Sequence, residues 1–163
     1  MQYQPHDYQE YATRFIVEHP VAAVLLQMGL GKSVITLSAI QELAFERFEI
    51  SRVLVIAPLR VARDTWPAEI QKWEHLQGLT YSVAVGTVPE RIAALKQNTL
   101  IHIINRENVP WLLEQSGLPF QYDMVVIDEL SSFKSYQAKR FRSLMKVRPK
   151  VKRFVGLTGT PSS

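Results

Sequence analysis

The sequence contains no cysteine, which excludes disulfide bonds, zinc sites built from thiolates and catalysis by a cysteine nucleophile. It has no apolar run close to the ~18 residues that span a membrane, and residues 1–5 lack the charged and then apolar layout of a signal peptide. No internal repeat or low-complexity segment is visible. These absences predict a soluble, unprocessed intracellular protein without a membrane partner, cytoplasmic in a bacterium or an infected cell and nuclear in a eukaryote.

What is present is a chain of 163 residues, 47% of them apolar, which is enough for one well-filled domain but not for two of ordinary size. The formal charge of +4 permits attraction to nucleic acid, and it is equally compatible with an ordinary solvated surface. Basic residues cluster between positions 134 and 153. We therefore expect a single, monomeric domain over residues 1–163.

Short apolar runs alternate along the chain with segments of helical period. Strands are predicted at residues 21–26, 52–57, 80–85, 100–104, 124–127 and 153–157. Helices are predicted at residues 7–19, 34–48, 61–76 (as two short helices, because Pro67 interrupts the segment), 89–96, 108–115 and 137–146. Strands separated by helices pair in parallel through right-handed crossovers. The predicted fold class is α/β, with a mostly parallel central sheet and helices on both faces. Because the chain stops directly after a strand and a turn, we expect it to be the N-terminal part of a longer protein.

A glycine-rich turn joins the first strand to the next helix and ends in Gly31-Lys32-Ser33. Gly29 and Gly31 allow a tight turn whose N–H groups can approach phosphate oxygens. The following helix presents its positive end, Lys32 can reach β- and γ-phosphates, and the Ser33 hydroxyl can ligate Mg²⁺. The strict phosphate-binding pattern has glycine where this chain has Leu26, so an ordinary strand-to-helix turn is the alternative.

Two adjacent carboxylates, Asp128 and Glu129, follow the apolar run 124–127. In an open α/β sheet the carboxyl ends of the strands are where ligands bind. Asp128 would hold Mg²⁺ directly or through water, and Glu129 would orient the attacking water or accept its proton. The alternative is that the pair begins a solvated loop. Hydrolysis of a phosphoanhydride needs the phosphate cradle, the metal and the base together, and the sequence supplies all three.

With Leu157-Thr158-Gly159-Thr160-Pro161, these segments resemble motifs I, II and III of superfamily-two helicases, and in particular the Swi/Snf-type ATPases, which translocate on duplex DNA. The resemblance spans nearly the whole chain and implies a RecA-like P-loop NTPase domain with ATP and Mg²⁺ as ligands. The residues that it implies for nucleotide binding are Gln9, Met28, Gly29, Leu30, Gly31, Lys32 and Ser33. It makes Lys32, Asp128 and Glu129 catalytic, and Ser33 and Asp128 the metal ligands.

Three shorter segments agree with this resemblance: Tyr8-Gln9 with the adenine-reading glutamine, residues 57–73 with motif Ia and its helix, and Asn105-Arg106-Glu107 with motif Ib. The resemblance also implies contacts between basic side chains and DNA phosphates, although taken singly each candidate is more typical of a surface charge than of a contact. The candidates are Arg60, Arg63, Arg106 and Lys134. Motif III would couple the nucleotide site to DNA through Thr158, Gly159 and Thr160. We interpret the tryptophans at 66, 73 and 111 as core residues rather than base-stacking platforms.

The chain departs from the family pattern at two places. It has Leu26-Gln27-Met28 where members have Asp-Glu-Met, and Ser131 where motif II has histidine, which alters the usual contact between motifs II and III. Superfamily-two enzymes complete the site with arginines from a second RecA-like domain in cis, and no such domain lies within these 163 residues. We therefore expect the polypeptide alone to bind ATP weakly and to hydrolyse it very slowly.

The predicted function is ATP binding and hydrolysis by a DNA-dependent translocase of the Swi/Snf-like branch, acting on double-stranded DNA. Three alternatives stay open at this point. The first is the motor of a restriction or replication-restart helicase, and the second is a small P-loop phosphotransferase. A phosphotransferase would need a lid bearing arginines and a second substrate pocket, neither of which is evident. The third is a non-catalytic module that keeps the nucleotide fold for protein contacts.

Overall fold

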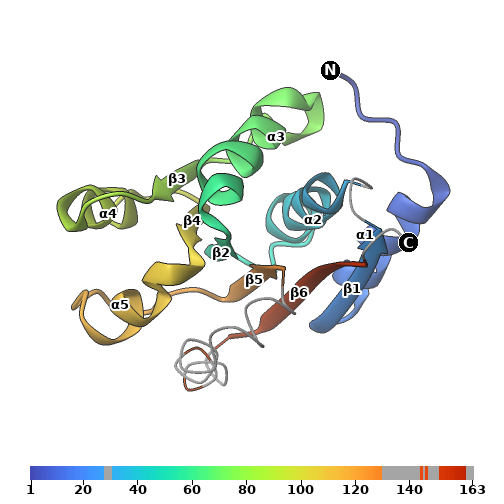
Figure 1. Cartoon of the computed structure of the whole chain (residues 1–163). Helices are drawn as coiled ribbons and strands as arrows, with labels where there is room; N and C mark the ends of the chain where they lie inside the picture. Colours follow the sequence, from blue (N-terminus) through green and yellow to red (C-terminus); the bar gives the residue numbers. More distant parts are fainter. Residues whose placement is uncertain (28–30, 130–143, 145, 147–150, 161–163) are drawn as a thin grey trace.

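The computed structural model describes residues 1–27, 31–129, 144, 146 and 151–160. Within them, six strands form one parallel sheet in the order β1-β6-β5-β2-β4-β3 (Figure 1). The strands are β1 (Val21–Gln27), β2 (Val53–Ala57), β3 (Tyr81–Ala84), β4 (Ile101–Asn105), β5 (Met124–Asp128) and β6 (Arg153–Thr160). The predicted α/β class with a parallel sheet is confirmed.

The connections between strands are helical, as predicted. The α-helices are α1 (Asp7–Glu18), α2 (Lys32–Gln41), α3 (Trp66–Lys72), α4 (Val88–Leu95) and α5 (Val109–Glu114). Shorter helical turns are η1 (Glu42–Glu46), η2 (Val61–Thr65), η3 (Glu74–Leu76) and η4 (Arg106–Asn108). The predicted helix at 137–146 lies outside the described residues except for positions 144 and 146; Leu144 is buried, as that prediction required.

The segment predicted as two short helices begins instead with a π-helical turn. In η2 the backbone N–H of Trp66 donates to the carbonyl of Val61, five residues earlier. Pro67 comes next, near the start of α3, and has no N–H to donate. Single π-helical turns of this kind occur within helical segments, and here the turn comes directly before the residue that cannot donate. The helical content was predicted from sequence, but the widened turn was not.

Both faces of the sheet are covered, which explains why its central strands are apolar throughout. All residues of β2, β4 and β5 are buried. Along β2, Val53 and Val55 pack into a cluster with residues of α1, α2 and α3. Leu54 and Ile56 pack on the opposite face with residues of α4 and α5. A strand buried on both faces has no polar alternation, so it appears in the sequence as a continuous apolar run.

Strand β6 is longer than predicted. It runs through Thr160, whereas the sequence predicted an end at Leu157 and a turn from there. The register explains the difference, because β1 offers partners along its full length. Leu25 pairs with Thr158 and Leu26 with Gly159.

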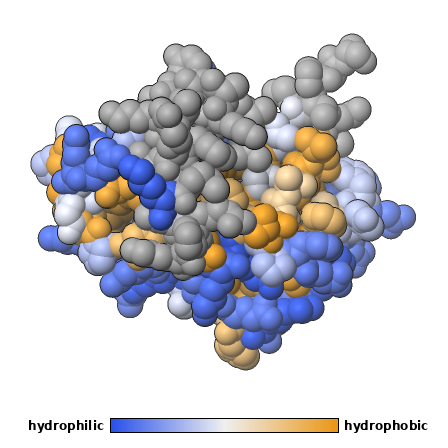
Figure 2. Space-filling model, turned by 90° about the horizontal axis from the view of Figure 1, so that it is seen from below, coloured by the Kyte–Doolittle hydropathy of each residue, from blue (hydrophilic) through white to orange (hydrophobic). Residues whose placement is uncertain are grey.

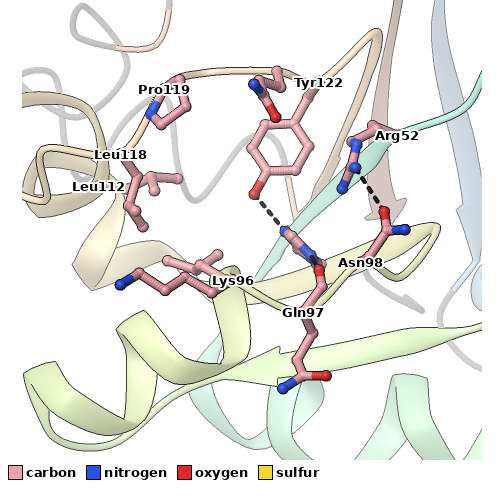
Figure 3. Close-up of a pocket in the computed structure, with 11 residues that line it drawn as sticks. Arg52, Lys96, Gln97, Asn98, Leu112, Leu118, Pro119 and Tyr122 are labelled. Carbon is pink, nitrogen blue, oxygen red and sulfur yellow. Dashed lines mark hydrogen bonds between the residues drawn. The ribbon is translucent and has the colours of Figure 1, made fainter.

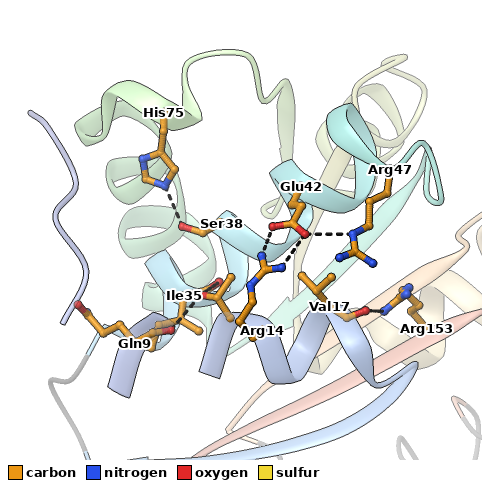
Figure 4. A network of polar contacts seen from close by, with 10 residues as sticks. Gln9, Arg14, Val17, Ile35, Ser38, Glu42, Arg47, His75 and Arg153 are labelled. Carbon is orange, nitrogen blue, oxygen red and sulfur yellow. Dashed lines mark hydrogen bonds and ion pairs between the residues drawn. The ribbon is translucent and has the colours of Figure 1, made fainter. Parts of the chain in front are cut away.

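Arg153, which the sequence placed in a basic cluster, has a structural role at the start of β6 (Figure 4). One guanidinium nitrogen donates to the carbonyls of Ile16 and Val17 at 3.1 and 2.9 Å, and the other donates to Glu49 at 2.8 Å. Carbonyls in the last turn of a helix lack intrahelical donors. Arg153 therefore ties the end of α1 to the sheet.

The edge strand β1 is buried on one face and exposed on the other. Ala22 and Val24 are 5% and 7% exposed, whereas Val21 and Leu25 are 59% and 68% exposed. Figure 2 shows one side of the molecule, on which hydrophobic patches lie between hydrophilic ones.

No helix within the described part of the chain is long and apolar enough to cross a membrane.

A cavity of about 220 Å³ lies at the amino ends of β2, β4 and β5, with Arg52, Lys96 and Tyr122 in its wall (Figure 3). Beneath it His102 is 3% exposed, with Nε2 2.9 Å from the Gln97 carbonyl and Nδ1 2.6 Å from the Tyr122 hydroxyl. A carbonyl only accepts, so Nε2 carries the proton and Nδ1 accepts from Tyr122. Burial lowers the pKa of His102, and it outweighs the opposing effect of the Gln97 carbonyl.

His102 is expected to make the protein sensitive to acid. Its pKa is lowered on folding, so the unfolded chain binds the proton first as pH falls below about 6.5, the ordinary value. The neutral ring therefore contributes its full stability above about pH 6.5. That contribution decreases as the pH falls from there to the lowered pKa of the folded protein. Urea unfolding at pH 7.5 and pH 5.5 should show a smaller loss for His102→Gln than for wild type.

The pKa of the partly buried His75 is also lowered by burial, so the same measurement on His75→Gln gives the part of the acid-induced loss of stability that is due to His75. Acidic side chains also lower the stability as the pH falls, and they do so equally in wild type, His102→Gln and His75→Gln. An equal loss of stability in wild type and His102→Gln would show that folding does not lower the pKa of His102.

Candidate functional site

The predicted site residues gather at the carboxyl edge of the sheet. Parallel strands place their last residues at one edge, and β6 lies directly between β1, which leads into the glycine-rich turn, and β5, which ends at Asp128. In register, Asp128 pairs with Leu157 and Leu25 pairs with Thr158. The three predicted motifs therefore lie on three adjacent strands.

Gly31, the last glycine of the turn, has a backbone conformation that other residues rarely adopt. Its φ is +78°, and a Cβ there would meet Gln9 Nε2 at 2.9 Å. Helix α2 begins at the next residue, and its first turn contains no acidic side chain. The positive end of α2 is therefore not neutralised by its own residues, which suits an anion. The predicted ligands Met28, Gly29 and Leu30 lie outside the described residues.

Lys32 meets both predicted carboxylates. Its Nζ lies 3.1 Å from Asp128 Oδ1 and donates a hydrogen bond to Glu129 Oε1. Burial of the ammonium lowers its pKa, but the bond to Glu129 and the charge of Asp128 outweigh this, so the pKa of Lys32 is raised. Lys32 stays charged at physiological pH. Ser33 follows in the first turn of α2 and is partly exposed.

The two oxygens of the Asp128 carboxylate have different surroundings. Oδ2 accepts a hydrogen bond from Trp66 Nε1 at 3.0 Å. Oδ1 is buried and accepts no hydrogen bond from the described residues, although the Lys32 ammonium faces it as an ion pair. A buried carboxylate oxygen whose present neighbour is a cation fits a hard cation such as Mg²⁺.

The donor set also fits Mg²⁺. Within the described residues no group of three or more histidine, aspartate or glutamate side chains could hold a metal ion. Mg²⁺ is usually bound by one or two carboxylates together with water and substrate phosphates, which does not require such a group. Asp128 and Ser33 are the side chains that would hold it.

Glu129 has a left-handed backbone, with φ of 61°. This region is uncommon for residues with a Cβ, and such conformations gather at functional sites. The turn follows β5 at once and brings the Glu129 carboxylate to Lys32. Its side chain is 29% exposed, compared with 5% for Asp128. Asp128 is therefore enclosed, while Glu129 is accessible to water.

Gln9 lies beside the glycine-rich turn, as the resemblance implied, but it has a second role that the sequence analysis missed. It is 8% exposed, and its Oε1 accepts from the backbone N–H of His6 at 2.9 Å as part of the N-terminal cap of α1. Its Nε2 faces Gly31. A cavity of about 480 Å³ opens here, lined by the N-terminal segment, Gln9, Gly31 and Trp73.

Three of the four candidate DNA contacts are described, and all follow the carboxyl ends of strands. Arg60 is exposed after β2. Arg63 in η2 donates twice to Asp64, each at 3.0 Å, and Arg106 pairs with Glu107 at 3.4 Å. Neighbouring carboxylates thus offset part of the positive charge at this edge. Lys134 and Ser131 lie outside the described residues.

The motif III residues form the end of β6. Thr158 and Gly159 pair with Leu25 and Leu26 of β1. They directly follow Leu157, which pairs with Asp128 of β5. The backbone of Thr160 pairs with Gln27, and the described part of the structure does not include its side chain. This strand therefore touches both the strand of the glycine-rich turn and the strand of Asp128.

Residues 9–163 match the family model of the SNF2-related domain. The chain belongs to the SNF2-related domain family. The resemblance to the Swi/Snf branch is thereby confirmed. Protein p41 of Acyrthosiphon pisum secondary endosymbiont phage 1 is 36% identical over 166 residues, covering 98% of this chain and 36% of that protein.

Other relatives of this SNF2-related chain are longer still. The DNA annealing helicase and endonuclease ZRANB3 of Bos taurus is 28% identical over 150 residues, which are 83% of this chain and 12% of that protein. Among solved structures, the Sulfolobus solfataricus SWI2/SNF2 ATPase core in complex with dsDNA matches 99% of this chain and 33% of its own, with a TM-score of 0.80 and 24% identity. The RecA-like fold is confirmed by that match. The chain spans about a third or less of the length of these proteins.

Proposed function

We propose that this SNF2-related domain binds ATP with Mg²⁺ at the carboxyl edge of its sheet and hydrolyses it to move along double-stranded DNA, together with a second RecA-like domain in cis. The observation that carries the proposal is the meeting of Lys32 with Asp128 and Glu129 beside the start of α2. Support also comes from relatives, since one is a DNA annealing helicase and one solved ATPase core is in complex with dsDNA.

Each side chain has a distinct task in this proposal. The first turn of α2 and the Lys32 ammonium bind the β- and γ-phosphates, for which Lys32 exchanges its present carboxylate partners. Asp128 and Ser33 hold Mg²⁺, which supplies neutralisation of charge on the phosphate oxygens. Glu129, released by Lys32, orients the attacking water and accepts its proton. Gln9 offers its amide to the adenine edge, because an amide oxygen has a second lone pair beyond the bond from His6.

DNA binds across the same edge in this proposal. Arg60, Arg63 and Arg106 follow β2 and β4 and contact phosphates, which fix position without reading sequence. Thr158 and Gly159 on β6 couple these contacts to the nucleotide. Each phosphate neutralised releases counterions, so affinity for DNA falls steeply with salt.

A longer polypeptide provides the test. Arginine fingers from a partner domain raise turnover by about 10³–10⁵ in related phosphoryl-transfer enzymes. ATP hydrolysis should therefore be measured for this chain and for a polypeptide extended through a second RecA-like domain, each with and without duplex DNA. We expect DNA-stimulated turnover only in the longer protein.

Each alternative predicts a different result in the same experiment. Fast turnover by the short chain with a small-molecule acceptor, without DNA stimulation of either protein, would indicate a phosphotransferase. Absence of any ATP binding would indicate a module that has kept only the fold. The motor of a restriction or replication-restart helicase shares this chemistry and would differ in its accessory domains.

A further inference from the structure

The Asp128 carboxylate is oriented by a side chain from a distant part of the sequence. Trp66 Nε1 donates to Oδ2 at 3.0 Å across a separation of 62 residues. This leaves Oδ1 as the oxygen that faces the Lys32 ammonium, 3.1 Å away. The Cβ–carboxylate torsion of an aspartate is broad, so the strand alone does not fix which way the carboxylate plane faces.

Trp66 is itself held firmly. It is 0% exposed and belongs to the core cluster between the sheet and helices α1 to α3. Its backbone is set by the π-helical turn η2 through the bond from its N–H to Val61, and Pro67 follows. A fully buried indole in a close-packed core sits in one well-defined rotamer on the time average. The N–H donor therefore stays where the fold places it.

We propose that Trp66 is a positioning residue for the metal ligand: its indole N–H fixes the Asp128 carboxylate so that Oδ1, which faces the Lys32 ammonium in this structure, is the oxygen that would hold Mg²⁺. The inference rests on the proposed function of the site. Hydrogen bonds from such outer partners orient metal ligands, and their loss typically weakens metal binding about 10–100-fold. Trp66 contacts neither the phosphates nor the water in this account and acts only through Asp128.

The test separates metal affinity from nucleotide affinity. Trp66→Phe keeps an aromatic ring and removes the donor. The rise in melting temperature with ATP is measured as a function of Mg²⁺ concentration, and ATP affinity is measured separately in EDTA. We expect the Mg²⁺ concentration at half effect to increase about tenfold or more in Trp66→Phe, with little change of ATP affinity in EDTA.

The matched control is Trp111→Phe. Trp111 lies in α5, on the opposite face of the sheet, and packs against the other core cluster with Arg91 over its ring. Trp111→Phe makes the same change of side-chain size on the other face of the sheet from Trp66. The rise in its melting temperature with ATP should therefore depend on Mg²⁺ concentration as in wild type. An unchanged Mg²⁺ dependence in Trp66→Phe overturns the inference while leaving the proposed function intact. A wild-type chain that shows no effect of ATP or Mg²⁺ overturns the proposed function instead.

A measurement on the wild-type fold covers the case in which Trp66→Phe does not fold. In a ¹H–¹⁵N spectrum, the indole N–H resonance of Trp66 should shift when Mg²⁺ is added to the ATP complex, and it should shift in Asp128→Asn without any ligand. The Trp111 resonance should stay in place in both experiments. A Trp66 resonance that is insensitive to Asp128→Asn would show that the hydrogen bond does not form in solution.

Discussion

Lys32→Ala is expected to abolish the rise in melting temperature that Mg²⁺ and ATP give the wild-type chain. At an ATP concentration about 100 times its Kd, binding stabilises a protein by about 2.7 kcal/mol. For a chain of this size that corresponds to a rise of about 5–10 °C. Without the ammonium, Asp128 and Glu129 face the phosphates with no lysine between them, and the like charges repel. Differential scanning fluorimetry with and without Mg²⁺ and ATP measures the effect.

The change caused by ligand, rather than the melting temperature itself, is the quantity to compare. Lys32→Ala leaves the buried Asp128 without its ion-pair partner, so the unliganded variant is also expected to melt earlier. Lys96→Ala is the matched control, because Lys96 is an exposed lysine at the cavity on the opposite edge of the sheet. A rise of wild-type size in Lys32→Ala would place the nucleotide elsewhere.

Glu129→Gln should separate binding from chemistry. Glutamine keeps the size of the side chain and an oxygen that can accept from Lys32, but it cannot take a proton from water. In the polypeptide that includes a second RecA-like domain, we expect DNA-stimulated hydrolysis to fall by about 10²–10⁴. The rise in melting temperature with Mg²⁺ and ATP should persist. Steady-state hydrolysis and thermal unfolding of the same preparation give both quantities.

Glu46→Gln, an exposed change on η1, serves as the control for removal of one carboxylate. It should leave both hydrolysis and binding unchanged. Turnover within a few-fold of wild type in Glu129→Gln would exclude Glu129 as the base, and a loss of binding together with turnover would assign it to nucleotide or metal affinity instead.

The sheet could be predicted from sequence because its central strands are buried on both faces. Strand β5 has no polar residue before Asp128, so its apolar run and its end are both visible in the sequence. The end of β6 was not visible, because Thr158 and Gly159 resemble a turn until β1 supplies their pairing partners. The π-helical turn before Pro67 was not visible either, because a turn widened by one residue leaves no periodic pattern in so short a segment.

In the candidate site, too, the contacts that follow from motif order could be predicted, and those that depend on core packing could not. The meeting of Lys32 with Asp128 was predicted, because motif order and parallel strands place them at one edge. The contact from Trp66 was missed, because a tryptophan among apolar residues indicates only a core position. One signal was available: a buried indole N–H and a buried carboxylate each need a partner. Arg153 likewise belongs to a cluster of basic residues in the sequence, although in the structure it binds the end of α1.

The central claim is that Lys32 and Asp128 form one site for ATP and Mg²⁺, and calorimetric titration of ATP into this chain tests it most directly. The titration is performed in Mg²⁺ and in EDTA, with wild type and Asp128→Asn. The account predicts one ATP per wild-type chain, bound more tightly in Mg²⁺ than in EDTA, and no such gain from Mg²⁺ in Asp128→Asn. Equal gains from Mg²⁺ in the two proteins, or no binding of ATP to wild type, would contradict it.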